Sequence, residues 1–132
     1  MRLLVDTNIF LEILLEQNRA EEAKDLLRKV DQHDFFISDF ALHSVGLLLL
    51  RQRKPDVFRQ FLSDLISNAG IIQLGLSPSE MEEVIQAAAS FRLDFDDAYQ
   101  YAVAERYGLA IVSFDSDFDR TAQGRIQPVS IT

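Results

Sequence analysis

The sequence predicts an α/β fold, a three-layer α/β/α sandwich in which helices cover both faces of a mainly parallel sheet. Short, wholly apolar runs alternate along the chain with longer amphipathic segments of helical period. The first run, residues 3–5, has no polar position, which is typical of a strand buried on both faces. Because strands separated by helices connect through right-handed crossovers, we expect the strands to be mainly parallel.

Each change in apolar periodicity places an element. The predicted strands are residues 3–5, 35–37, a strand that begins at 71–72, 110–114 and a fifth within 126–131. The predicted helices are residues 8–16, 19–30, 39–53, 55–70, 78–91 and 95–107.

Several helix ends carry capping signals. Ser38 or Asp39 can cap the third helix, and residues 77–80 form a capping box with proline at the first helical position. Asp94 can cap the last helix, and Gly108 is placed to end it in a left-handed conformation.

Length and composition narrow the function. The 132 residues predict a single domain, residues 1–132, with an ordinary globular composition. The formal net charge of −8 excludes broad, sequence-independent attraction to nucleic acid, but not an enzyme whose carboxylates gather in one metal site. The lack of cysteine excludes disulfides and thiolate catalysis. No signal peptide or membrane-length apolar run is present, so we expect a cytoplasmic protein without membrane contact.

Aspartates follow two of the predicted strands. Asp6 ends the first strand and Asp115 follows the fourth. Ligands of open parallel sheets bind beyond the carboxyl ends of the strands, so both carboxylates are candidates for one crevice. The alternative that each aspartate only caps the next helix or turn stays open.

Acidic residues are concentrated between positions 94 and 119. Asp96 and Asp97 are explained by the dipole of the helix that they begin, whereas the alternating Asp115, Asp117 and Asp119 are not. Clustered carboxylates repel one another, and a divalent cation removes that conflict. Oxygen ligands alone favour Mg²⁺ or Mn²⁺.

Other chemistries fit less well. A calcium loop beginning at Asp115 would need Gly and Glu where Arg120 and Ile126 stand. His33 lies in a polar turn and is expected to face solvent, and His43 is expected to be a structural residue of an apolar helix.

Three motifs, taken in order, resemble the PIN domain family: VDTN at residues 5–8, FDDA at 95–98 and VSFDSDF at 112–118. The resemblance covers essentially the whole chain and implies a PIN-like fold. It implies a metal-dependent nuclease, chiefly acting on RNA, and small members of the family are often VapC-type toxins of toxin–antitoxin pairs. The implied partners are therefore an RNA substrate and an antitoxin protein.

The resemblance also assigns residues. It implies Asp6, Asp97 and Asp115 as catalytic residues and ligands of Mg²⁺ or Mn²⁺. The implied accessory residues are Asn8, Asp96, Ser113 and Asp117. PIN domains similar to this one commonly pair, and the apolar run 47–50 with Phe58, Phe61 and Leu62 predicts a homodimer through the helices around residues 40–66.

One position departs from the family pattern. The second acid, usually a Glu, lies about six residues past a Ser or Thr that matches Ser38, and Ser44 stands there. The candidate substitutes for that acid are Glu12, Asp39, His43 and Asp96.

Two other functions remain as alternatives. The first is a non-catalytic PIN-like domain that binds RNA or protein. The second is a receiver- or phosphatase-like domain, which is weaker because a receiver needs a lysine near the chain end and none follows Lys54.

Overall fold

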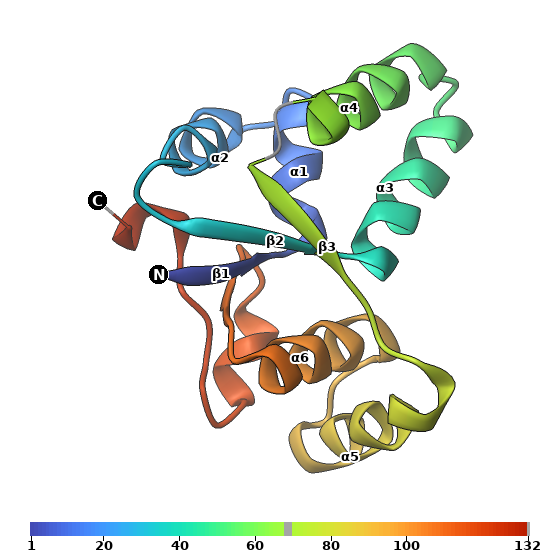
Figure 1. Ribbon diagram of the computed structural model, residues 1–132, viewed down its shortest axis with the longest axis vertical. Coiled ribbons are helices and arrows are strands. Elements are labelled where there is room, and N and C mark those ends of the chain that lie inside the picture. The colour runs from blue at the N-terminus through green and yellow to red at the C-terminus, as the bar shows by residue number, and fades with distance from the viewer. Residues whose placement is uncertain (68–69, 132) are drawn as a thin grey trace.

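The computed structural model describes residues 1–67 and 70–131 and contains one four-stranded sheet. Its strands are β1 (Arg2–Val5), β2 (Asp34–Ser38), β3 (Ile71–Leu74) and β4 (Ala110–Val112). They lie in the order β3-β2-β1-β4, and every pairing is parallel (Figure 1). The predicted α/β/α sandwich with a mainly parallel sheet is therefore confirmed.

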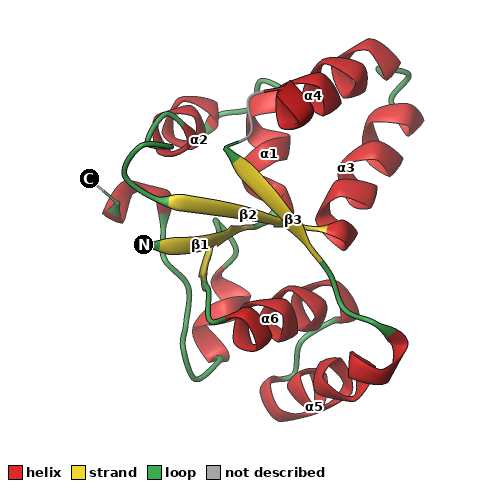
Figure 2. Cartoon of the chain, viewed as in Figure 1, coloured by secondary structure: helices red, strands yellow, loops and turns green. Residues whose placement is uncertain are grey.

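Helices cover both faces of the sheet (Figure 2). They are α1 (Thr7–Leu14), α2 (Ala20–Leu27), α3 (Asp39–Arg51), α4 (Pro55–Ser67), α5 (Met81–Phe91) and α6 (Phe95–Tyr107). Helices α1 to α4 lie on one face, and α5 and α6 lie on the other (Figure 1). Two residues of the predicted helix 55–70, at positions 68 and 69, lie outside the described residues. Within the described part of the chain, no helix combines the length and apolarity needed to cross a bilayer.

The alternation of side chains along each strand divides the core in two. Leu3 and Val5 of β1 pack against the helices of the first face, whereas Leu4 between them packs against α5 and α6. All three side chains are fully buried. Complete burial of a leucine or valine side chain stabilises the fold by about 1.5–3 kcal/mol relative to exposure. The wholly apolar strands thus supply both halves of the core.

The order of the strands reverses beside β1. The chain passes from β1 through β2 to β3 by way of α1 to α4, then returns across the other face through α5 and α6 to β4. Strand β4 pairs with β1, with Ile111 opposite Leu4. The carboxyl ends of β1 and β4 therefore flank the topological switch point, where open α/β sheets bind their ligands.

The predicted fifth strand is wrong. Ile126 forms a single parallel bridge to Val112, and Pro128–Ser130 is a short 3₁₀ helix. The bridge is held by the N–H of Ile126, which donates to Ile111 at 2.8 Å, and by the N–H of Ser113, which donates to Ile126 at 3.0 Å. Pro128 has no N–H to continue such a ladder.

The prediction that His33 faces solvent is also wrong. Its side chain is half-buried, with Nδ1 3.1 Å from the amino group of Met1. Its Nε2 is buried without a hydrogen-bond partner among the described residues. The cause is the register of the sheet, which places Arg2 opposite Asp34 and brings the N-terminus beside the turn before β2.

The apolar surface predicted for a homodimer is composed differently from the expectation. Phe61 packs edge-on against Phe10 in the core at 5.3 Å between ring centres. Phe58 lies over Gly46, where a Cβ would come within 2.7 Å of its ring. Both rings therefore pack against residues of the same chain rather than forming a free surface for a second copy. The exposed apolar side chains of this region are Leu47, Leu50, Ile66 and Ile72.

Candidate active site

Acidic side chains from three elements meet at the switch point. Asp6 directly follows β1, Asp115 follows β4, and Asp97 lies in the first turn of α6. These three aspartates line a pocket of about 250 Å³ together with Asn8 and Asp96. The structure thus brings the acids of the two strand ends and the helix start together.

Asp6 is almost completely buried and is held by three donors. Its Oδ1 accepts from the N–H of Thr7 at 2.9 Å and from Nε2 of Gln100 at 3.1 Å, and its Oδ2 accepts from Oγ of Ser113 at 2.7 Å. Burial raises the pKa of Asp6, the three hydrogen bonds lower it in part, and the charge of Asp115 raises it further. Asp6 also caps α1, so capping and site formation are two roles of one side chain.

Ser113 directs its hydroxyl hydrogen at Asp6. Its Oγ accepts two hydrogen bonds, from the N–H of Asp115 at 2.9 Å and from Nδ2 of Asn8 at 3.1 Å. With both acceptor positions occupied, the hydroxyl donates to Asp6. The amide of Asn8 is oriented in turn by the N–H of Phe114, which donates to its Oδ1 at 3.3 Å.

In the part of the chain that the structure describes, three carboxylates lie close enough together to share one cation. One oxygen each from Asp97, Asp115 and Asp117 lies within 4.8 Å of the others. Burial raises the pKa of Asp97 to about 8, and the charges of Asp115, Asp96, Asp6 and Asp117 add to the shift. The donor set fits a hard divalent cation, because all ligands are oxygens and a cation favours their ionised form. Asp6 lines the same pocket outside this group.

The family model of the PIN domain matches residues 3–124. The chain belongs to the PIN domain family. No curated protein matches this PIN domain by sequence.

Solved structures repeat the fold over nearly the whole chain. A toxin–antitoxin complex from Klebsiella pneumoniae contains a chain 23% identical, with a TM-score of 0.73 over 95% of this chain and 96% of that one. VapC20 of Mycobacterium tuberculosis, a sarcin-ricin loop cleaving toxin, is 19% identical, with a TM-score of 0.79 over 96% and 99%. VapBC2 of Rickettsia felis, bound to a DNA fragment from its promoter, is 13% identical, with a TM-score of 0.77 over 96% and 98%. At these identities the likeness establishes the fold.

Ser44 of this PIN domain, which we expected in place of the family's second acid, lines the acidic pocket. Among the four candidate substitutes, Asp96 lines the same pocket. Asp39 is engaged elsewhere, by the Tyr99 hydroxyl at 2.7 Å and by the N–H of Phe40 at 2.8 Å.

The other two candidate substitutes lie away from the acidic pocket. Glu12 accepts from the N–H of Arg19 at 3.2 Å, in a separate hollow beside α1. His43 is exposed on α3, so the expectation that it is a structural residue of that helix is wrong.

Sequence reasoning missed Gln100. Its side chain is buried on α6, three residues after Asp97, and joins Asp6 to the Oγ of Ser38. Ser38 is also the cap of α3, where it accepts from the N–H of Ala41 at 2.9 Å. The available signal was an amide inside an otherwise apolar helical stretch, which needs partners when it is buried.

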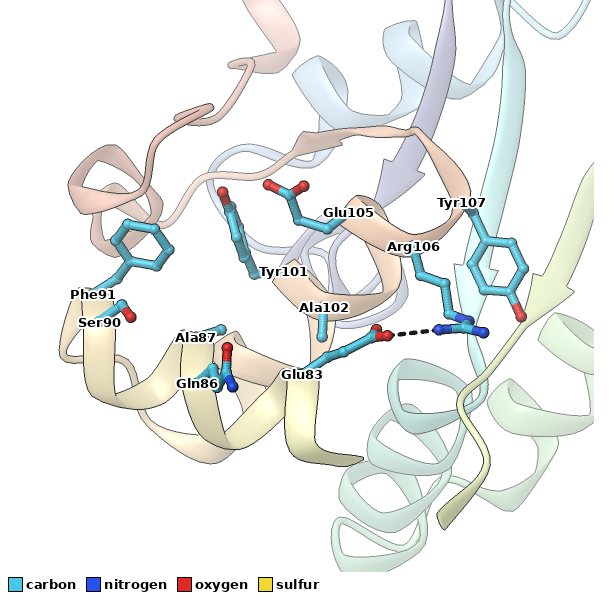
Figure 3. Close-up of a pocket in the computed structure, with 10 residues that line it drawn as sticks. All are labelled: Glu83, Gln86, Ala87, Ser90, Phe91, Tyr101, Ala102, Glu105, Arg106 and Tyr107. Atoms are coloured by element: carbon cyan, nitrogen blue, oxygen red, sulfur yellow. Dashed lines mark hydrogen bonds and ion pairs between the residues drawn. The ribbon is translucent and has the colours of Figure 1, made fainter. Parts of the chain in front are cut away.

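A wider hollow of about 610 Å³ lies between α5 and α6 (Figure 3). Arg106 projects into it and pairs with Glu83 at 2.6 Å and with Glu80. Tyr101 also lines it, and burial together with a hydrogen bond to Glu105 raises the pKa of that phenol to about 12. Among the described residues, the carboxylates close enough together to hold one cation are Asp97, Asp115 and Asp117, and none of them lines this hollow, so the acidic pocket is the better candidate for catalysis.

Proposed function

We propose that this PIN domain is a metal-dependent endoribonuclease that hydrolyses phosphodiester bonds and serves as the toxin of a type II toxin–antitoxin pair. The single observation that carries the proposal is the group formed by Asp97, Asp115 and Asp117, whose oxygens lie within 4.8 Å of one another at the switch point. Membership of the PIN family supports a nuclease. Structural likeness to toxin–antitoxin complexes supports an antitoxin as partner.

Asp97, Asp115 and Asp117 would hold Mg²⁺ or Mn²⁺, with Asp6 as a further ligand from the same pocket. A bound cation of this kind lowers the pKa of water and stabilises the charge that grows on phosphate oxygens. The protein's own contribution is to hold the carboxylates in place before substrate arrives. Desolvation and mutual repulsion make the ionised form of Asp97 costly, and a neighbouring positive charge would offset that cost.

The residues around Asp6 fix its orientation. Ser113 and Gln100 each donate to a different oxygen of the carboxylate, which leaves little freedom for rotation. Asn8 fixes Ser113 in turn. Supporting contacts of this kind are what hold a catalytic group to within the small tolerances that catalysis requires.

The test is metal binding and RNA cleavage by the wild type and by Asp97→Asn and Asp115→Asn. Calorimetry with Mn²⁺ is expected to show affinity reduced about tenfold or more in each variant, since a charged ligand is lost. Cleavage of single-stranded RNA is expected to require Mg²⁺ or Mn²⁺ and to disappear with EDTA.

The matched control is Asp64→Asn, which removes an exposed carboxylate of α4 that does not line the acidic pocket. It should bind metal and cleave RNA as the wild type does. Equal Mn²⁺ affinity in Asp97→Asn and in the wild type would contradict the ligand assignment.

Ser44 favours one second candidate function, a PIN domain that binds RNA without cleaving it. A serine hydroxyl in the acidic pocket supplies no charge to balance a cation. RNA binding without turnover at millimolar Mn²⁺ would decide for this candidate and against the nuclease.

A further inference from the structure

Three aromatic rings gather beside the acidic pocket. Phe40 and Phe95 meet edge to face, with ring centres 5.8 Å apart. Tyr99 lies against both, at 5.6 Å from Phe40 and 6.0 Å from Phe95. The three residues come from two elements. Phe40 lies in the first turn of α3, and Phe95 and Tyr99 lie in the first two turns of α6. No hydrogen bond given above for Asp6, Asn8 or Ser113 involves these three side chains.

Hydrogen bonds of Tyr99 hold the aromatic cluster in place. The Tyr99 ring is buried, and its hydroxyl donates to Asp39 at 2.7 Å and accepts from the N–H of Leu76 at 3.0 Å. Asp39 is itself held by the N–H of Phe40. The buried Tyr99 ring is thus held at its hydroxyl by two hydrogen bonds, and Phe40 and Phe95 pack against it.

Phe95 is the exposed member of the cluster. Its side chain is 56% exposed, although an aromatic ring is costly to leave in water. It directly precedes Asp96 and Asp97, and Phe40 is part of the wall of the acidic pocket. The aromatic cluster and the acidic pocket are therefore continuous.

We propose that Phe95, supported by Phe40 and Tyr99, is a stacking platform for a nucleobase of single-stranded RNA adjacent to the phosphate at the acidic pocket. The proposal rests on the ribonuclease function proposed above. Every base has a π face, so an exposed ring beside a phosphate site binds unpaired nucleotides without reading their sequence.

The negative charge of the chain explains why a stacking contact would matter for RNA binding. With a formal net charge of −8, this chain lacks the cationic excess that usually draws proteins to RNA. Asp94 and Asp96, on either side of Phe95, are exposed carboxylates. A protein contact covering Phe95 would have to desolvate these charges, whereas a flat base can lie on the ring and leave them in water. Stacking supplies affinity that needs no cationic side chain.

The experiment measures binding of a short single-stranded RNA that carries the fluorescent base 2-aminopurine, with Mn²⁺ present. Every protein carries Asp115→Asn, so turnover is blocked in all samples alike. The parent is the protein with Asp115→Asn as its single substitution. Phe95→Leu keeps an apolar side chain and removes the ring, and Phe95→Trp supplies a larger ring. The matched control is Ile85→Leu, a change at an equally exposed apolar residue of α5.

We expect Phe95→Leu to weaken binding about fivefold to tenfold and to abolish the change in base fluorescence, as loss of one stacked base predicts. Phe95→Trp should bind at least as tightly as the parent, and Ile85→Leu should bind equally well. An abasic RNA should bind the parent and Phe95→Leu with equal affinity, because the stacked base is then missing from both complexes.

Three results would overturn the platform. The first is that the parent does not bind RNA, and the second is that Phe95→Leu binds RNA as tightly as the parent. The third is that Phe95→Leu weakens binding of the abasic RNA as much as binding of the intact RNA. Light scattering that shows a smaller assembly for Phe95→Leu would also overturn it, because Phe95 would then lie between protein copies.

The platform and the nuclease can fail separately. Base-dependent binding through Phe95 by a wild-type protein that never cleaves RNA would uphold the platform and refute the nuclease. Cleavage with the same KM in wild type and Phe95→Leu would do the reverse.

Discussion

The amide of Gln100 bridges two strand ends that are distant in sequence. Its Nε2 donates to Oδ1 of Asp6 at 3.1 Å, while its Oε1 accepts from Oγ of Ser38 at 2.5 Å. All three side chains are buried, so each depends on the others for hydrogen bonds that water cannot supply. One side chain of α6 thereby links the ends of β1 and β2 at the edge of the acidic pocket.

The bridge predicts a stability cost for Gln100→Leu. The change leaves Asp6 with two donors and Ser38 without its acceptor, which should lower the free energy of unfolding by about 1–3 kcal/mol. Chemical denaturation measures this cost. Gln86→Leu, at an exposed position of α5, is the control and should change stability much less. Similar effects of the two substitutions would show that the bridge contributes nothing.

Asp97 predicts a pH dependence in metal-free protein. Its pKa is about 8 in the fold against an ordinary value of 3.8, so between these values the folded state binds more protons than the unfolded state. The contribution of Asp97 to the free energy of unfolding therefore falls as pH rises from about 4 to about 8. Asp97→Asn removes this contribution, so the stability of the variant relative to wild type should increase with pH.

Denaturation in EDTA at several pH values between 5 and 8 tests this. The control Asp64→Asn should follow the wild-type curve, as its carboxylate is exposed on α4. A constant difference between Asp97→Asn and wild type across this range would contradict the prediction.

Ser44→Glu restores the family pattern and should strengthen metal binding. The new carboxylate enters a pocket that already holds Asp6, Asp97 and Asp115. It should raise Mn²⁺ affinity and the rate of RNA cleavage, and it should destabilise the metal-free protein through added repulsion. Calorimetry and cleavage assays measure the gain, with Asp6→Asn as the inactive reference. Strong wild-type cleavage in low Mg²⁺ that the new Glu does not improve would show that another residue, such as Asp96, already fills the gap.

The exposed apolar side chains of α3, α4 and β3 predict a homodimer. Leu47 and Leu50 are more than half exposed on α3, and Ile66 of α4 is 81% exposed. Burial of these side chains between two copies would stabilise the pair. Light scattering at micromolar concentration should give twice the chain mass of 15.1 kDa, and Leu50→Glu should return it to 15.1 kDa.

Val129→Glu is the control for the dimer, since Val129 is exposed in the 3₁₀ helix near the C-terminus. It should leave the mass unchanged. A wild-type mass near 15.1 kDa would refute pairing through this surface.

Local signals predicted the elements best where two of them agreed. Helix α6 spans residues 95–107 as expected. Gly108 ends it with φ of +66°, and Asp94 stands at its N-cap position, although the Asp94 side chain makes no capping hydrogen bond. The prediction for α2 extended three residues beyond its end at Leu27, where the apolar spacing continued without a stop signal. The prediction of a fifth strand was wrong because a strand needs a hydrogen-bonded partner along its length, and Ile126 pairs with Val112 in a single bridge.

The sequence by itself determined the layers of the fold and the acids at the strand ends, because strand burial and helix capping depend on residues close together in the chain. It could not show that Gln100 donates to Asp6 or that Asp39 accepts from Tyr99. Asp117 was expected as an accessory residue, but not that its carboxylate lies within 4.8 Å of those of Asp97 and Asp115. Those contacts join residues 94, 60 and 20 positions apart for the pairs Asp6–Gln100, Asp39–Tyr99 and Asp97–Asp117. Only the crossover from β3 to β4 brings them together, and their geometry is decided by packing of the whole sheet rather than by any local pattern.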